Sequence, residues 1–220
     1  MANVATPEQI HAAWKDLRSF IEIAHAMGEL EVVEGADPKE EMGAIYELSL
    51  DREIPPVLLF EGMKGTNSDR RVVVNVRSSR VFNSGFGLDR VRSFRNQRRS
   101  GTPQMIPPRL VNTGPVLENI VEGDDVDIYA FPTPKWHEGD GGQYIGTECL
   151  VITKDPDSDW VNIGTYRVQV QDKKTLTVFM EPGKHGDGIR RKYWAKGQAC
   201  PMIVCVGQAP VLGSVAASTL

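Results

Sequence analysis

The sequence predicts an α+β protein in which a mixed region of helices and strands precedes a region built mainly of β-strands. Before about residue 100, segments with helical spacing of apolar residues alternate with short apolar runs. Beyond residue 102, proline and glycine separate closely spaced β-rich runs, a pattern typical of a barrel or sandwich. A cluster of prolines and a glycine near 100–115 marks the boundary, so we predict an N-terminal α/β domain over 1–110 and a β-domain over 111–220.

The composition is that of a folded globular protein, with 40% hydrophobic and 25% charged residues in a chain of 220. A net charge of −4 disfavours a nucleic-acid-binding face, so the basic run at 90–101 is expected to be a solvated helix face. No segment approaches the roughly 20 apolar residues of a bilayer span, and the N-terminus lacks the pattern of a signal peptide. Cys149, Cys200 and Cys205 form no CxxC pair, and we expect them as buried free thiols in a reducing, cytoplasmic setting.

The N-terminal elements follow from caps and apolar spacing. Thr6 with Pro7 indicates a first helix, which Asp16 restarts or continues up to a stop at Gly28. A second helix is predicted over 37–50, with Asp37 as its cap. Short strands are expected at 30–35, 55–62 and 70–76, and a helix that ends at Gly101 closes the region.

The second half is expected to contain four strands and one helix. The predicted strands lie at 148–155, 159–172, 174–183 and 200–207. The run "QDKKT" between the second and third strands is a plausible hairpin connection. The run 185–198 is expected to be a short helix within the β-region.

The predicted strand "VNIGTYRVQV" (161–170) carries two side chains that strands seldom need, Asn162 and Arg167. Residues five apart point to opposite faces of a regular strand. A bulge or kink at Gly164 would bring both side chains to one side. From spacing alone, an arginine in a strand is usually an edge charge paired with Asp or Glu, and a functional role for Arg167 is the alternative.

His185 lies in "EPGKHGDG", at the end of the strand that returns from the predicted hairpin. Antiparallel pairing places residues near 181–185 opposite those near 161–165, so we expect Asn162 and His185 to be neighbours. An amide oxygen and a neutral imidazole form part of a divalent-cation site that still lacks an anionic ligand. A surface role for His185 remains open, and the run 137–142 is interpreted as a glycine-rich turn in preference to an acidic metal loop.

Three blocks of the sequence resemble one family. "FPTPKWHEGDGGQYIGTECLVITKDPDS", "WVNIGTYRVQVQDKKTLTVFMEPGKHG" and "GQAPVLGSVAAST" are similar, in wording and order, to the UbiD family of reversible decarboxylases. The resemblance extends over nearly all of the chain and is densest from 131 to 220. It implies prenylated FMN, a divalent cation (Mn²⁺ or Mg²⁺) and K⁺ as cofactors. It also implies that the β-domain is the first, truncated part of a split β-barrel of flavin-reductase type that binds the cofactor.

The resemblance assigns roles to particular positions. Asn162 and His185 would ligate the divalent cation that bridges the flavin phosphate, and Arg167 would be catalytic, held near the substrate carboxylate and a glutamate. The remaining implied positions are the backbone of Ile163, Gly164 and Thr165 along the cofactor, Lys184 facing the phosphate, and a K⁺ and phosphate loop with Ala216, Ser218 and Thr219.

The implied function is reversible, non-oxidative decarboxylation of an aromatic or α,β-unsaturated carboxylic acid. The implied partners are a flavin prenyltransferase that supplies the cofactor and further copies of the chain, as a homodimer or homohexamer. The family's metal-binding and acid–base glutamates lie beyond Leu220, so we expect a fragment that is inactive alone. The alternatives are a flavin-binding split-barrel protein without lyase activity, such as a reductase or cofactor carrier, and a structural assembly subunit.

Overall fold

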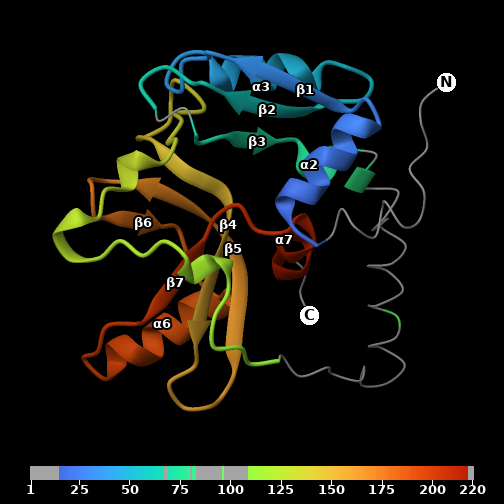
Figure 1. Cartoon of the computed structure of the whole chain (residues 1–220). Helices are drawn as coiled ribbons and strands as arrows, with labels where there is room; N and C mark the ends of the chain where they lie inside the picture. Colours follow the sequence, from blue (N-terminus) through green and yellow to red (C-terminus); the bar gives the residue numbers. More distant parts are fainter. Residues whose placement is uncertain (1–14, 67–68, 80, 83–95, 97–108, 218–220) are drawn as a thin grey trace.

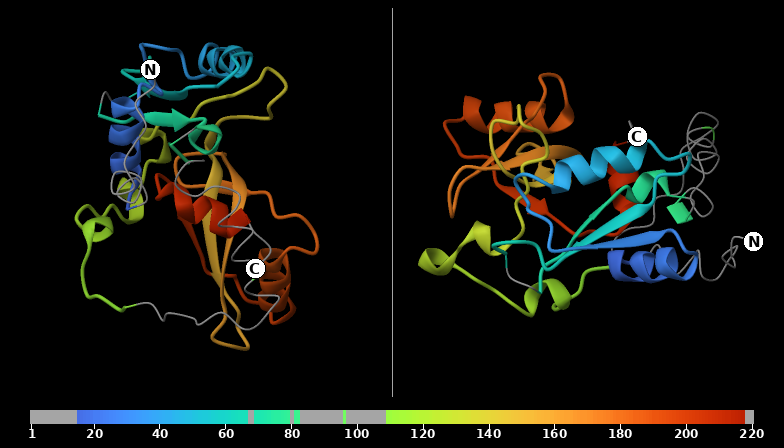
Figure 2. Two further views of the ribbon diagram at one scale, coloured as in Figure 1. Left: turned by 90° about the vertical axis from the view of Figure 1, so that its right-hand side faces the viewer. Right: turned by 90° about the horizontal axis from the view of Figure 1, so that it is seen from above.

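The computed structural model describes residues 15–66, 69–79, 81–82, 96 and 109–217, and these contain two β-sheets (Figure 1). A three-stranded sheet belongs to the first half of the chain and a four-stranded antiparallel sheet to the second. Helices accompany both sheets, which confirms the predicted mixture of α and β structure. The views in Figure 2 show the two sheets as separate bodies joined by the loops between them.

The first sheet has the strand order β1-β2-β3. β1 and β2 are parallel, while β3 runs antiparallel to β2. Two helices accompany the sheet, and α3 lies across β1 and β2 in Figure 1. The bounds are α2 (Leu17–Ala26), β1 (Leu30–Glu34), α3 (Met42–Leu50), β2 (Val57–Glu61) and β3 (Val72–Val74).

The core of the first half is split by β2, because successive side chains of a strand point to opposite faces. Val57 packs with Phe20 and Ala24 of α2 in one cluster. Leu58 and Phe60 belong to a second cluster with Met42, Met63 and Ala36. Both faces of β2 are therefore covered, in keeping with its continuous apolar sequence.

The predicted helix caps are right at one helix and wrong at the other. Asp16 caps α2, with its carboxylate accepting from the Ser19 N–H at 2.7 Å, and Gly28 follows with a φ of +69°. The second helix begins at Met42 and not at Asp37. The Asp37 carboxylate accepts from the Lys39 N–H instead, and this local turn delays the start of the helix.

The second sheet has the order β6-β5-β4-β7 and is antiparallel throughout (Figure 1). The Gln171 N–H donates to the Thr175 carbonyl at 2.9 Å, which confirms the predicted hairpin between β5 and β6. The sheet curls into a half-barrel in Figures 1 and 2. The bounds are β4 (Tyr144–Lys154), β5 (Val161–Val170), β6 (Leu176–Val178), α6 (His185–Ala195), β7 (Met202–Cys205) and α7 (Pro210–Ala217).

The bulge predicted at Gly164 is wrong. The β4–β5 register is continuous from Val161 to Tyr166, and the irregularities lie in β4, between Tyr144 and Cys149. Gly164 serves close packing: an added Cβ there would lie 2.5 Å from a ring carbon of Tyr166. The glycine makes room for a neighbouring side chain, so it leaves the strand straight.

Some predicted elements lie outside the described residues: the helix after Thr6, almost all of the helix that was predicted to end at Gly101, and the positions Ser218 and Thr219. Ala216, the described member of the K⁺ and phosphate positions that the resemblance implied, lies in the last turn of α7.

The two halves meet where α3 contacts the loop before β4. An added Cβ at Gly43 would lie 1.7 Å from the Trp136 carbonyl oxygen, so only glycine permits this approach. The Lys135 N–H donates to the Pro38 carbonyl at 2.9 Å, and the His137 Nε2 lies 2.9 Å from a Glu47 carboxylate oxygen. The run 137–142 is thus a turn that joins the two halves, as the sequence interpretation favoured.

The segment between the halves leaves apolar side chains in solvent. It contains three short 3₁₀ helices, Pro115–Leu117, Gly123–Asp125 and Ile128–Ala130, and it runs along the outside of the two sheets in Figure 2. Its exposed apolar residues include Leu110, Val111, Val116, Leu117, Ile120 and Val121. An apolar surface of this kind favours contact with further polypeptide.

The cysteines agree with the expectation in part. All three thiols are free, but only Cys149 is buried, while Cys200 and Cys205 are partly exposed. Burial raises the pKa of the Cys149 thiol to about 12, which makes it a structural side chain and not a nucleophile. No helix within the described ranges is long and apolar enough to cross a membrane.

Candidate active site

The start of β5 and the first turn of α6 meet at Asn162 and Tyr166. Asn162 is only 7% exposed. The Tyr166 hydroxyl lies against the first turn of α6, since an added Cβ at Gly186 would be 2.7 Å from its oxygen, and burial raises the pKa of this tyrosine. A strand and a helix that are separated by the hairpin are thereby joined through one phenol group.

The predicted approach of His185 to the start of β5 is consistent with this arrangement. β6 returns along β5 from the hairpin, with Val178 opposite Val168, and so leads the chain back toward the start of β5. The His185 ring packs edge-on against Trp160, with 5.0 Å between ring centroids. Direct contact between the side chains of Asn162 and His185 stays a prediction, although their chain segments are neighbours.

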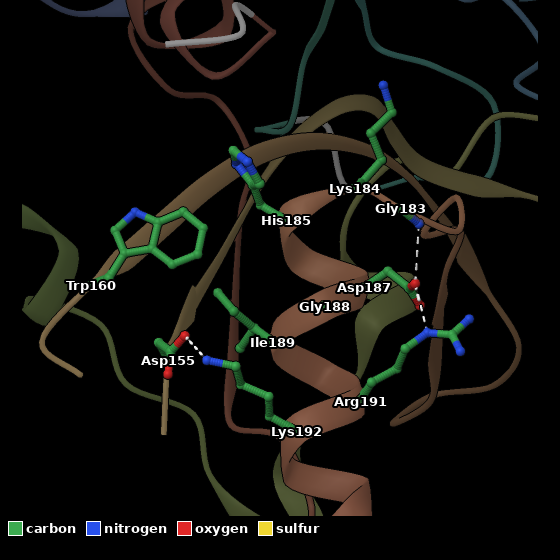
Figure 3. Close-up of a pocket in the computed structure, with 10 residues that line it drawn as sticks. All are labelled: Asp155, Trp160, Gly183, Lys184, His185, Asp187, Gly188, Ile189, Arg191 and Lys192. Atoms are coloured by element: carbon green, nitrogen blue, oxygen red, sulfur yellow. Dashed lines mark hydrogen bonds and ion pairs between the residues drawn. The ribbon is translucent and has the colours of Figure 1, made fainter. Parts of the chain in front are cut away.

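A cavity of about 430 Å³ opens beside this helix start (Figure 3). Figure 3 shows Lys184 and His185 at the first turn of α6, with Trp160 facing the histidine and Lys192 reaching Asp155 lower down. The Lys192 Nζ lies 2.6 Å from the Asp155 carboxylate, and this pairing holds the pKa of Asp155 below its usual range. Lys184 and His185 stand at the N-terminal end of α6, where the helix dipole and the Lys184 ammonium suit an anion such as phosphate.

Asp187 fixes the helix start. Its side chain is 3% exposed and accepts from the Arg191 Nε at 2.8 Å, from Arg190, and from the Gly183 N–H at 3.3 Å. These donors, Arg191 first, lower the pKa of the Asp187 carboxyl. Both carboxylate oxygens of Asp187 already accept hydrogen bonds within the protein. The aspartate therefore holds the turn before α6 in place and is not available as a metal ligand.

Arg167 lies on the opposite face of β5 from Asn162. Along β5, Asn162, Gly164 and Val168 are buried, whereas Ile163 and Arg167 are exposed and Thr165 is half-buried between them. The Arg167 guanidinium sits 5.6 Å from the centre of the Phe179 ring. No carboxylate in the described part of the chain pairs with Arg167, so the ordinary role of a strand-edge ion pair is absent there.

Sequence reasoning missed Glu148. It lies in the irregular stretch of β4 that faces Arg167 in the ladder, between the partners of Tyr166 and Val168. Desolvation raises the pKa of the Glu148 carboxyl, opposed by Arg77, whose Nε lies 3.1 Å away. An acidic residue within the apolar run "ECLVIT" was the available signal.

The residues present fit a divalent cation only in part. The Asn162 Nδ2 is buried without a hydrogen-bond partner, which marks a polar group that the protein alone leaves unsatisfied. Within the described ranges, no group of three or more His, Cys, Asp or Glu side chains could hold a metal ion. Asn162 and His185 would therefore be two neutral ligands, and an anionic ligand would have to join them.

The family follows from the match of a known sequence profile. The profile of the "UbiD: 3-octaprenyl-4-hydroxybenzoate carboxy-lyase Rift-related domain" matches residues 109–220, just over half of the chain. The chain belongs to the UbiD family. This match contains β4, β5 and α6, and so all of the site described above.

The UbiD chain also has curated relatives named as decarboxylases. It is 31% identical to the pyrrole-2-carboxylic acid decarboxylase of Pseudomonas aeruginosa, over 89% of this chain and 42% of that protein. It is 30% identical to a phenolic acid decarboxylase of a Streptomyces species, over 93% of this chain and 45% of that protein.

Two solved structures of UbiD-type enzymes share the fold. The vanillic acid decarboxylase of Sedimentibacter hydroxybenzoicus in its closed form matches with a TM-score of 0.82 and 26% identity, over 94% of this chain and 46% of that one. An evolved dimeric form of the UbiD-class enzyme HmfF from Pelotomaculum thermopropionicum, in complex with prFMN, matches with a TM-score of 0.75 and 26% identity, over 89% of this chain and 45% of that one. The chain spans less than half the length of each of these four proteins.

Proposed function

We propose that this chain takes part in the reversible decarboxylation of an aromatic or α,β-unsaturated carboxylic acid, with prenylated FMN bound at the start of β5. The observation that carries the proposal is the junction of Asn162, Tyr166 and the first turn of α6. It lies inside the region that defines the family, and relatives over this region are named decarboxylases. Those names favour a lyase over the alternative of a flavin carrier or reductase.

The phosphate end of the cofactor would be held at the helix start. Asn162 and His185 would ligate a divalent cation that bridges the phosphate, and Lys184 would add a positive charge. The exposed ammonium of Lys184 is only weakly engaged, 3.8 Å from Glu181, so it is free to turn toward an anion. When bound, prenylated FMN would supply the electron sink that the loss of CO₂ requires.

The substrate end would use the other face of the strand. Arg167 presents a planar guanidinium, which binds a carboxylate through two parallel hydrogen bonds. Because Asn162 and Arg167 point to opposite faces, we infer that phosphate and substrate approach β5 from different sides. The backbone of Ile163, Gly164 and Thr165 would lie between them, along the cofactor.

The other parts of the proposal rest on the family resemblance. They are Mn²⁺ or Mg²⁺ as the divalent cation, K⁺ near Ala216, Ser218 and Thr219, a flavin prenyltransferase as the source of the cofactor, a split β-barrel of flavin-reductase type, and assembly as a homodimer or homohexamer. Of the K⁺ positions, only Ala216 lies in the described part of the chain.

The test is to produce the 220-residue chain together with a flavin prenyltransferase and purify it without oxygen. Its absorbance spectrum and its CO₂ release from aromatic and unsaturated acids are then recorded, with and without a polypeptide equivalent to the rest of the relatives' length. We expect weak flavin binding, self-association and no turnover by the chain alone, because two neutral ligands bind a hard cation weakly. Flavin binding and turnover should both recover with the added polypeptide. A chain that turns over substrate alone would contradict this account of its chemistry.

A further inference from the structure

We propose that Tyr166 is a positioning residue that sets the orientation of the Asn162 amide at the candidate cation site. It does so by bridging β5 to the first turn of α6. This inference rests on the proposed function, because it assigns the residue that holds the candidate ligand in place.

The space around Tyr166 is provided by two glycines from different elements. An added Cβ at Gly164 of β5 would lie 2.5 Å from a carbon of the Tyr166 ring. An added Cβ at Gly186 of α6 would lie 2.7 Å from the Tyr166 hydroxyl oxygen. Any larger residue at either position would displace the phenol, so the backbone on both sides is fitted to this one side chain.

The Tyr166 hydroxyl lies between the helix start and the start of β5. Its oxygen would be 2.7 Å from an added Cβ at Gly186 and 3.0 Å from one at Gly164, the residue two positions after Asn162 on the same face of the strand. Directly across the ladder from Asn162 lies Thr153, only 2% exposed. The Thr153 Oγ1 and the Asn162 Nδ2 are both buried without a partner. Two buried polar groups without hydrogen-bond partners, at paired positions of neighbouring strands, indicate a binding site whose ligand would alter how these side chains are hydrogen-bonded.

The chemistry of an amide ligand explains what the two hydroxyls would do. Asparagine binds a cation through its Oδ1, so its Nδ2 must find an acceptor on the other side. The hydroxyls of Tyr166 and Thr153 both offer oxygen lone pairs next to Asn162. Removing a group that hydrogen-bonds to a metal-ligating side chain typically weakens metal affinity by roughly 10- to 100-fold.

The decisive variant is Tyr166→Phe, which keeps the ring and deletes the hydroxyl. The probe is unprenylated FMN, followed by the quenching of its fluorescence, in buffer that contains either MnCl₂ or EDTA. Every protein compared here, the unaltered chain included, is purified together with the added polypeptide, because the chain alone is expected to bind the cation weakly. With Mn²⁺ present, we expect the variant to bind FMN about tenfold more weakly than the unaltered chain. With EDTA, the two proteins should bind FMN equally, because the hydroxyl acts only through the cation ligand.

Two pairs of variants control for unrelated damage. Tyr193→Phe deletes the same group from the last turn of α6, at the opposite end of the helix from Gly186, and should bind FMN as the unaltered chain does. Gly186→Ala should reproduce the loss seen in Tyr166→Phe by displacing the phenol. Gly139→Ala adds a Cβ that meets no atom within 4 Å, and it should have no effect.

Each outcome decides a different point. Equal FMN affinity of Tyr166→Phe and the unaltered chain in Mn²⁺ would overturn the role of Tyr166 and leave the proposed function standing. An equal loss in Mn²⁺ and in EDTA would show that Tyr166 supports only the fold, which also overturns the inference. If Mn²⁺ has no influence on FMN binding by the unaltered chain, the proposed cation site is wrong and this inference with it.

Discussion

The two faces of β5 differ in burial and in what they offer to a ligand. The face toward α6 carries Asn162 and Tyr166, and the Tyr166 hydroxyl packs against Gly186 at the helix start. The other face carries Ile163 and Arg167, both exposed, with the arginine lying over Phe179. Because side chains alternate along a strand, one segment of ten residues presents both environments.

The two faces of β5 therefore suit two different tasks, binding an ion and binding a carboxylate. The buried face is fixed by packing and hydrogen bonds, which suits a group that must hold one geometry for an ion. The exposed face keeps its guanidinium unpaired among the described residues, ready for a carboxylate. This difference between the faces would be contradicted if substitutions on the exposed face disturbed the fold, or if substitutions on the buried face left the fold intact.

The largest expected effect is on the exposed face. Arg167→Lys keeps the charge but loses the planar fork, so we expect decarboxylation to fall about 10²-fold or more while flavin stays bound. The measurement is CO₂ release together with flavin content, in the preparation that contains the added polypeptide. Normal turnover at full flavin occupancy would reduce Arg167 to a surface charge.

The next effect is on the buried face. Gly164→Ala would force a Cβ against the Tyr166 ring, and we expect a loss of about 1–3 kcal/mol in the free energy of unfolding. Urea denaturation compares this variant with Gly139→Ala, whose added Cβ meets no atom within 4 Å and should change stability by less than about 0.5 kcal/mol. Equal stability of the two variants would mean that Tyr166 is not packed as described.

The helix start should make stability depend on pH. The pKa of Asp187 is lower in the folded chain than its ordinary value of about 3.9. Its contribution is therefore fully present above pH 4 and is lost as the pH falls through the folded pKa. We expect Asp187→Asn to have a lower unfolding midpoint than the unaltered chain at pH 7. The difference between the two midpoints should become smaller near pH 3. A difference that does not change with pH would exclude the ionised Asp187 carboxylate as the source of the stabilisation.

The smallest expected effect is at Glu148. Arg77 and Glu148 are both partly exposed, so we expect Arg77→Gln to destabilise the fold by about 1 kcal/mol or less. Because Arg77 opposes the upward effect of burial, its loss should raise the pKa of Glu148 further. NMR titration of the Glu148 carboxyl carbon measures this shift. A fall in that pKa would contradict the pairing.

Local signals predicted much of this fold, whereas packing decided what they missed. The hairpin at "QDKKT" sets the β5–β6 register and returns the chain toward the start of β5, where His185 packs against Trp160. The cap at Asp16 is likewise a local signal. By contrast, the close packing that explains Gly164 requires the position of Tyr166, and the role of Tyr166 requires Gly186 of another element. Periodicity could not reveal these relations, because one depends on how the Tyr166 side chain is oriented along β5 and the other on its contact with α6.

The central claim is that the start of β5 and the first turn of α6 hold the cation and the flavin phosphate. The most direct measurement is the Mn²⁺ and flavin content per chain, for the unaltered protein and for His185→Ala, each purified with the prenyltransferase and the added polypeptide. We expect both contents to fall together in His185→Ala, because the imidazole is one of the two protein ligands that we propose for the cation. Arg167→Lys, on the other face, should retain both. Unchanged Mn²⁺ and flavin in His185→Ala would contradict the claim.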